Sequence, residues 1–222
     1  MASSNIPGIE VNKPNTNPTI DSEESFYELP FYKDADYMFS LENEVAFIKS
    51  VERLVRTSKY YSRYIAHMKN DLGMNFCQVK SNIAEPDENG GLIEMHHGPI
   101  FTLFDVVSIV LNYMIVKNMK VTTFSVANRV IEEHFKHRVQ TVMLCKTVHQ
   151  AVHDNKVFLN YKQGFGDLYS FLEYYYEGLD ESHVRAIMDY IEKSEKYDSN
   201  DFGNLDVIVT RWKTEYPDYD DF

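Results

Sequence analysis

Two short segments have the composition of β-strands, and helical patterns surround both. Segment 92–97 follows a Gly-rich turn, and Gly98-Pro99 ends it. Segment 138–145 contains three β-branched residues, a type that favours strands. In most of the remaining chain, apolar residues recur at helical spacing. The sequence therefore predicts an α+β fold that is predominantly helical and contains little sheet.

Helices are expected on both sides of each strand segment. A long apolar stripe predicts helix over 40–72, with a candidate break at Thr57-Ser58. Two more helices, over 102–117 and 123–137, are expected between the strand segments, the first opening with a capping box. Thr147 is expected to cap a helix after the second strand, and two further helices are expected over 167–177 and 180–196.

Charge is distributed unevenly along the chain, whose net charge is −12. This acidic balance disfavours nucleic-acid binding, since the phosphate backbone attracts Lys and Arg. However, residues 117–162 hold eight basic and three acidic side chains, and residues 49–80 hold seven and two. The acidic residues concentrate at the two ends. Solubility alone would account for them, or the ends could shield a basic centre or bind a partner protein.

Cysteine content and hydropathy bear on the cellular compartment. The two cysteines, Cys77 and Cys145, lie in different sequence settings, which argues against a disulfide scaffold and against a four-cysteine zinc site. The most apolar stretch, 100–116, contains Asp105 and Asn112 and suits a buried helix better than a membrane span. These features favour a cytoplasmic protein without a membrane partner.

Four of the eight histidines form two tight clusters. His96 and His97 are adjacent at the end of the first strand segment. His149 and His153 have i, i+4 spacing, which places two imidazoles on one face of a helix, as in helical zinc sites. The residue after His149 is Gln150, so the glutamate base of the helical metalloprotease motif is missing. Alternatively, either histidine cluster is an ordinary solvated surface.

Together, the two clusters resemble the HNH (ββα-metal) endonuclease family. Segment 94–99, Glu-Met-His-His-Gly-Pro, resembles the first strand of colicin-type DNases, and segment 142–153 resembles the second strand and helix. The resemblance implies a DNA endonuclease that uses one divalent cation, such as Mg²⁺, Mn²⁺, Ni²⁺ or Zn²⁺. It also implies a ββα unit whose two strands are separated here by a helical insertion.

The resemblance assigns a role to each matching residue. The implied metal ligands are His96, His149 and His153. His97 would be the general base for the attacking water, and Glu94 would orient neighbouring groups. Gln140 aligns with the asparagine that braces the loop between the strands, and its greater length puts that brace in doubt. The second zinc-knuckle cysteine of some relatives is replaced, so no structural zinc knuckle is expected.

Five regions follow from these patterns: a mobile N-terminal arm (1–27), an N-terminal helical region (28–90), the HNH-like module with its inserted helices (91–163), C-terminal helices (164–204) and an acidic tail (205–222). The small size and the Tyr- and Asn-rich composition resemble bacteriophage proteins, so the host cytoplasm is the expected location. Two alternatives remain open: a non-catalytic phage protein that keeps the ββα fold for structural or binding purposes, and an inhibitor or regulatory protein whose acidic ends bind a basic partner.

Overall fold

The computed structural model describes residues 41–80, 83–85 and 92–196. The predicted N-terminal arm and acidic tail lie outside these residues. The chain divides into two compact units, Met1–Ser50 and Val51–Phe222, and every contact discussed below lies within the second unit. No helix in the described part of the chain is long and apolar enough to cross a membrane.

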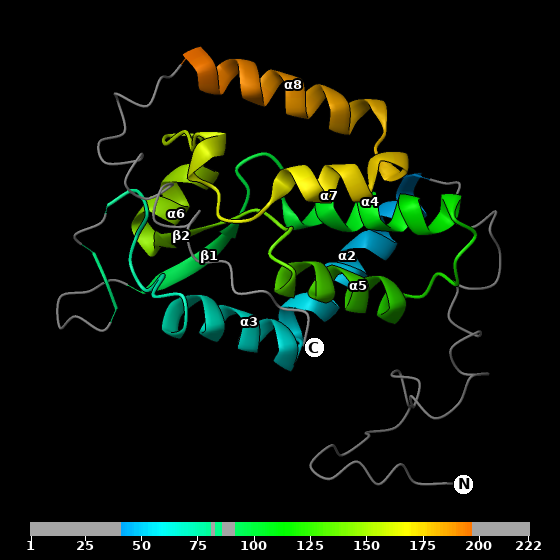
Figure 1. Ribbon diagram of the computed structural model, residues 1–222, viewed down its shortest axis with the longest axis horizontal. Helices are drawn as coiled ribbons and strands as arrows, with labels where there is room; N and C mark the ends of the chain where they lie inside the picture. The colour runs from blue at the N-terminus through cyan, green and yellow to red at the C-terminus, as the bar shows by residue number, and fades with distance from the viewer. Residues whose placement is uncertain (1–40, 81–82, 86–91, 197–222) are drawn as a thin grey trace, which may run out of the picture. The chain divides into compact units, whose positions relative to one another are not determined.

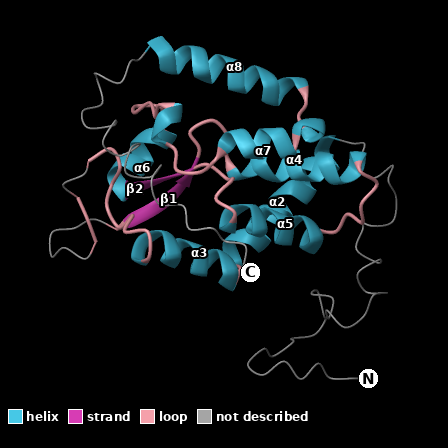
Figure 2. Ribbon diagram, in the orientation of Figure 1, coloured by secondary structure: helices cyan, strands magenta, loops and turns pink. Residues whose placement is uncertain are grey.

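The described chain is predominantly helical, as predicted, with one small antiparallel sheet (Figure 2). Its elements, in order, are α2 (Leu41–Thr57), α3 (Lys59–Asn70), β1 (Ile93–His97), α4 (Leu103–Val116), α5 (Thr123–Phe135), β2 (Thr141–Cys145), α6 (Lys146–His153), η3 (Tyr161–Gln163), α7 (Leu168–Tyr174), η4 (Tyr176–Gly178) and α8 (Glu181–Lys196). The predicted break at Thr57-Ser58 is confirmed, because Ser58 caps α3 by accepting a hydrogen bond from the Tyr60 N–H group.

The two strands pair although 43 residues separate them in the sequence, from Gly98 to Gln140. In the antiparallel register, Ile93 lies opposite Cys145 and His97 lies opposite Thr141. Helices α4 and α5 occupy the intervening segment and pack against each other. The expected helical insertion is therefore observed. Figure 1 shows α6 beside the two strands, and α6 contacts both of them.

Helix α4 supplies much of the core. Its apolar residues surround the helix, and seven of them are buried: Leu103, Val106, Val107, Ile109, Val110, Leu111 and Met114. The predicted Thr102–Asp105 capping box is present at its start. Gly178 of η4 packs directly on this helix, where an added Cβ would lie 2.2 Å from the Ile109 carbonyl oxygen. A residue without a side chain is therefore required at this crossing.

Two sequence-based boundaries were wrong. Strand β2 begins at Thr141 rather than Arg138, because the Arg138 N–H group bonds to the Glu133 carbonyl and extends the end of α5. Helix α6 begins at Lys146, directly after the strand, so Cys145 rather than Thr147 occupies the N-cap position. Cys145 makes no side-chain capping bond. No linker residue separates β2 from α6, so the backbone conformation of Cys145 sets the direction in which α6 leaves the strand.

Candidate metal centre

Three of the four clustered histidines converge in space. His96 lies on β1, whereas His149 and His153 lie on α6. Each offers one ring nitrogen, and the three nitrogens lie within 4.8 Å of one another. The rings of His149 and His153 are 5.1 Å and 5.2 Å from the His96 ring, centroid to centroid. This group is the one cluster of three or more metal-binding side chains found among the described residues.

The antiparallel pairing explains why these side chains meet. His96 lies opposite Val142 on β2, and α6 starts at the end of that same strand. One helical turn then separates His149 from His153, so both rings lie above the same face of the sheet. Gly98 follows β1 with φ of +139°, a conformation that glycine favours, and an added Cβ there would lie 3.3 Å from His96 Nε2. The turn after β1 therefore leaves space beside this imidazole.

Glu94 orients one of the three imidazoles. It lies two residues before His96, and residues two apart on a strand share a face. Its Oε2 atom is 2.6 Å from His149 Nδ1, so Nδ1 carries the proton and donates it to the carboxylate. The Nε2 lone pair of His149 then faces the other histidines. A carboxylate that fixes a ligand histidine in this way is a recurring feature of metal sites.

The spacing of the helical pair fits a shared cation. The Nε2 atoms of His149 and His153 are 3.1 Å apart. Two nitrogens that each lie about 2.1 Å from one tetrahedral zinc ion are separated by about 3.4 Å. His96 and His149 are half-buried, while His153 is exposed. A cation bound here would therefore have three protein ligands and a side open to solvent, the arrangement typical of catalytic rather than structural zinc sites.

The electrostatic environment favours neutral, metal-binding imidazole at His96. Burial lowers the pKa of His96 to about 4, with further lowering by the charges of His149, His153 and Arg56. His96 is therefore unprotonated at neutral pH, which is the form that binds metals. Arg56 lies at the end of α2, and its side chain is 53% exposed. The sequence does not indicate this proximity of Arg56 to the histidines, because it depends on the tertiary fold.

His97 lies on the opposite face of β1 from His96 and Glu94. Burial alternates along this strand, and His97 is only 6% exposed. Its Nε2 atom is 2.9 Å from His134 Nε2, and His134 Nδ1 is 2.6 Å from the Val130 carbonyl oxygen. Because His134 donates its Nδ1 proton to that carbonyl, its Nε2 accepts the Nε2–H of His97. The ring of Tyr61 stacks on His97.

This buried histidine pair is held in the neutral form. Burial lowers the pKa of His134 to about 4 and the pKa of His97 well below its usual value. The general-base role of His97 stays a prediction, and its position favours a packing role. The alternation of strand side chains was the sequence signal that separates His97 from its neighbour.

Gln140, which precedes β2, forms hydrogen bonds through both its backbone and its side chain, while the bracing role implied by the family resemblance stays a prediction. Its carbonyl oxygen accepts a hydrogen bond from the Gly98 N–H group, and its side-chain Nε2 donates to the Tyr161 carbonyl at 2.8 Å. An added Cβ at Gly164 would lie 2.2 Å from Gln140 Cγ, so the long side chain occupies a tight space. These bonds connect the end of β1 to η3. Gln140 thus contacts the loop after β1, while its side chain is directed to Tyr161.

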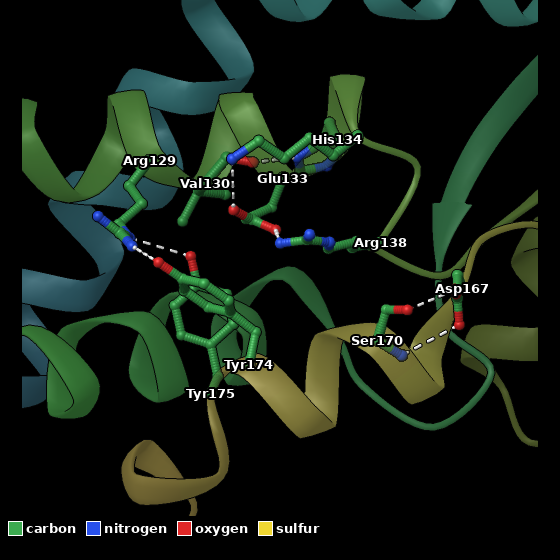
Figure 3. Close-up of polar contacts among 10 residues, drawn as sticks. Arg129, Val130, Glu133, His134, Arg138, Asp167, Ser170, Tyr174 and Tyr175 are labelled. Atoms are coloured by element: carbon green, nitrogen blue, oxygen red, sulfur yellow. Dashed lines mark hydrogen bonds and ion pairs between the residues drawn. The ribbon is translucent and has the colours of Figure 1, made fainter. Parts of the chain in front are cut away.

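Several basic side chains of segment 117–162 have intramolecular partners. Figure 3 shows Arg129 directed at the hydroxyls of Tyr174 and Tyr175, at 2.7 Å and 3.0 Å. Arg138 forms an ion pair with Glu133, a side chain that is 99% buried and also pairs with Lys136. This cluster joins α5 to α7 and the residue that follows it. These tyrosines therefore have a packing role at this junction.

Comparison with known proteins gives a family match. A model of the bacteriophage G278-like virion protein family matches residues 6–219, which is most of the chain. No curated protein and no solved structure matches it. The phage origin suggested by composition is therefore supported, whereas no HNH endonuclease family was found. The chain belongs to the bacteriophage G278-like virion protein family.

Proposed function

We propose that this virion protein is a metal-dependent endonuclease that hydrolyses phosphodiester bonds in DNA. The single observation that carries the proposal is the convergence of His96, His149 and His153 within 4.8 Å. Three imidazoles that approach from a strand and a helix would hold one divalent cation and leave its solvent side open. A phosphate oxygen and a water molecule need such open positions.

The topology adds independent support. The two strands are antiparallel, α6 follows the second strand, and the histidine pair lies on that helix. This β-β-α order is the one implied by the resemblance of segments 94–99 and 142–153 to HNH endonucleases. The insertion between the strands folds as α4 and α5 and leaves the strand pairing intact. The insertion between the strands therefore does not argue against the proposal.

The chain's own residues have distinct tasks in this proposal. Glu94 holds the His149 ring so that Nε2 faces the cation site. Arg56 adds positive charge near His96, which favours a phosphate in the same region. When bound, a divalent cation would act as a Lewis acid and stabilise negative charge on the scissile phosphate. A general base must lie within hydrogen-bond reach of the attacking water, and His97 on the opposite face of β1 does not favour that role.

Plasmid nicking tests the proposal. Purified protein is incubated with supercoiled DNA and Mg²⁺, Mn²⁺, Ni²⁺ or Zn²⁺. We expect nicking with at least one cation, and its loss in His153→Ala. Gln150→Ala is the matched control, because Gln150 is exposed on the same helix and lies outside the histidine group. Intact plasmid with every cation, or equal nicking by His153→Ala and the wild type, would overturn the endonuclease proposal.

A non-catalytic metal site in a structural virion protein is the second candidate. The observation that favours it is the burial of His97 against His134, which leaves the three-histidine group without this base. The acidic net charge also favours a protein partner over DNA. Metal binding that depends on His153 while plasmid stays intact would select this candidate. An increase in thermal stability on metal addition would then be its functional signature.

A further inference from the structure

The two cysteines meet beside the sheet, although 67 residues separate them in the sequence. Gln78 is hydrogen-bonded to the edge of β2 that does not pair with β1. Its N–H group donates to the Met143 carbonyl at 2.8 Å, and its side-chain oxygen accepts the Met143 N–H. Cys77 therefore lies alongside Cys145, the last residue of β2. The two cysteines lie in different settings in the sequence, and the fold brings them together.

The thiols themselves are in hydrogen-bonding contact. The side chains of Cys77 and Cys145 are hydrogen-bonded to each other, and the Cys145 N–H group also donates to the Cys77 sulfur. The Lys80 N–H group donates to the same sulfur at 3.4 Å. Neighbouring extended segments lie about 5 Å apart, and disulfides join Cα atoms separated by about 4.4–6.8 Å. Both cysteines are free and buried.

We propose that Cys77 and Cys145 form an oxidation site that closes to an intramolecular disulfide. Peroxide is the oxidant class. The Cys77 thiolate attacks one peroxide oxygen, the O–O bond breaks, and the products are a sulfenic acid and water. The Cys145 sulfur then attacks the sulfenic sulfur, and a second water leaves. Two thiols and one peroxide thus give one disulfide and two waters, with both sulfurs oxidised and the peroxide reduced.

The proximity of Cys145, rather than a readily formed thiolate, favours disulfide closure at Cys77. Burial raises the pKa of the Cys77 thiol, and the backbone N–H groups of Cys145, Lys80 and Val79 at its sulfur offset only part of that rise. Because peroxide reacts with the thiolate, oxidation should be slow at neutral pH and faster at alkaline pH. Burial of both sulfurs also slows exchange with other thiols, so reversal by dithiothreitol should be slow. A virion encounters the cytoplasm during assembly and an oxidising medium after release. Both thiol and disulfide forms therefore fit the family to which the chain belongs.

A disulfide between Cys77 and Cys145 would lie at the start of α6. Cys145 directly precedes α6, the helix that carries His149 and His153. A disulfide to Cys77 would fasten the preceding segment to the edge of β2 at the start of this helix. The crosslink would also close a long loop that contains β1, α4 and α5, which restricts the unfolded chain.

Peptide mapping after hydrogen peroxide treatment tests the inference on the full chain. Trypsin places Cys77 in peptide 70–80 and Cys145 in peptide 139–146. We expect these two peptides to become linked, the link to be reversed by dithiothreitol, and the protein to stay monomeric on a non-reducing gel. Methionine oxidation changes peptide masses without joining peptides, so linked pairs are scored in every methionine state.

Cys145→Ser is the matched control, since it leaves Cys77 in place and removes its partner. It should give no linked pair under the same treatment. The oxidised wild type should also show a higher thermal midpoint than the reduced form, and dithiothreitol should abolish this shift. Two unlinked thiols after treatment, irreversible over-oxidation of Cys77 in the wild type, or disulfide-linked dimers would overturn the inference.

Discussion

Replacement of Glu94 by Gln tests whether the carboxylate supports a metal site. The substitution keeps the size of the side chain and removes the charge that accepts the His149 Nδ1–H bond at 2.6 Å. This short, charge-assisted bond is half-buried, so its loss should matter more than the loss of a surface ion pair. Carboxylate partners of ligand histidines typically change metal affinity about 10- to 100-fold, or about 1.4–2.7 kcal/mol.

Isothermal titration with Zn²⁺ measures this change. We expect Glu94→Gln to raise the dissociation constant by about 10- to 100-fold without altering the stoichiometry. Glu132→Gln is the control, because it removes the same charge from an exposed position on α5. If both variants weaken binding equally, net charge accounts for the effect. If Glu94→Gln binds as tightly as the wild type, the role assigned to this carboxylate is refuted.

Two further predictions concern stability. In metal-free protein, His134 has a folded-state pKa of about 4 against 6.5 for the ordinary group, so the unfolded state binds more protons between these pH values. The free energy of unfolding should therefore fall as the pH drops from 6.5 to 4, by about 3 kcal/mol for this group. Urea titrations at pH 7.5, 5.5 and 4.5 measure the change, and a pH-independent midpoint would contradict it. Gly178→Ala should destabilise the fold by about 1–3 kcal/mol through overpacking, since its Cβ would meet the Ile109 carbonyl; an unchanged thermal midpoint would show that this crossing can relax.

Local sequence patterns predicted the elements on which the site is built. The Thr102–Asp105 pair forms the expected capping box, and the i, i+4 spacing of His149 and His153 does place both rings together. These features depend on residues within one turn of one another, so local chemistry determines them. The convergence of that pair with His96 also agrees with the prediction, although it depends on pairing between distant strands.

Other features depend on the path of the whole chain. The contact between Cys77 and Cys145 arises because Gln78 completes the edge of β2, and no local pattern indicates this placement. The proximity of Arg56 to the histidines is equally non-local. By contrast, the inward direction of His97 follows from strand alternation. This direction disfavours the general-base role that the family resemblance implies for His97, a role that stays a prediction.

The most direct measurement is anomalous diffraction from crystals grown with Zn²⁺, recorded on both sides of the zinc absorption edge. The account predicts one strong peak per chain, within about 2.1 Å of a ring nitrogen from each of His96, His149 and His153. The peak should vanish in crystals of His149→Ala. No peak at these histidines, or a zinc ion bound only elsewhere on the chain, would contradict the metal centre on which the proposed function depends.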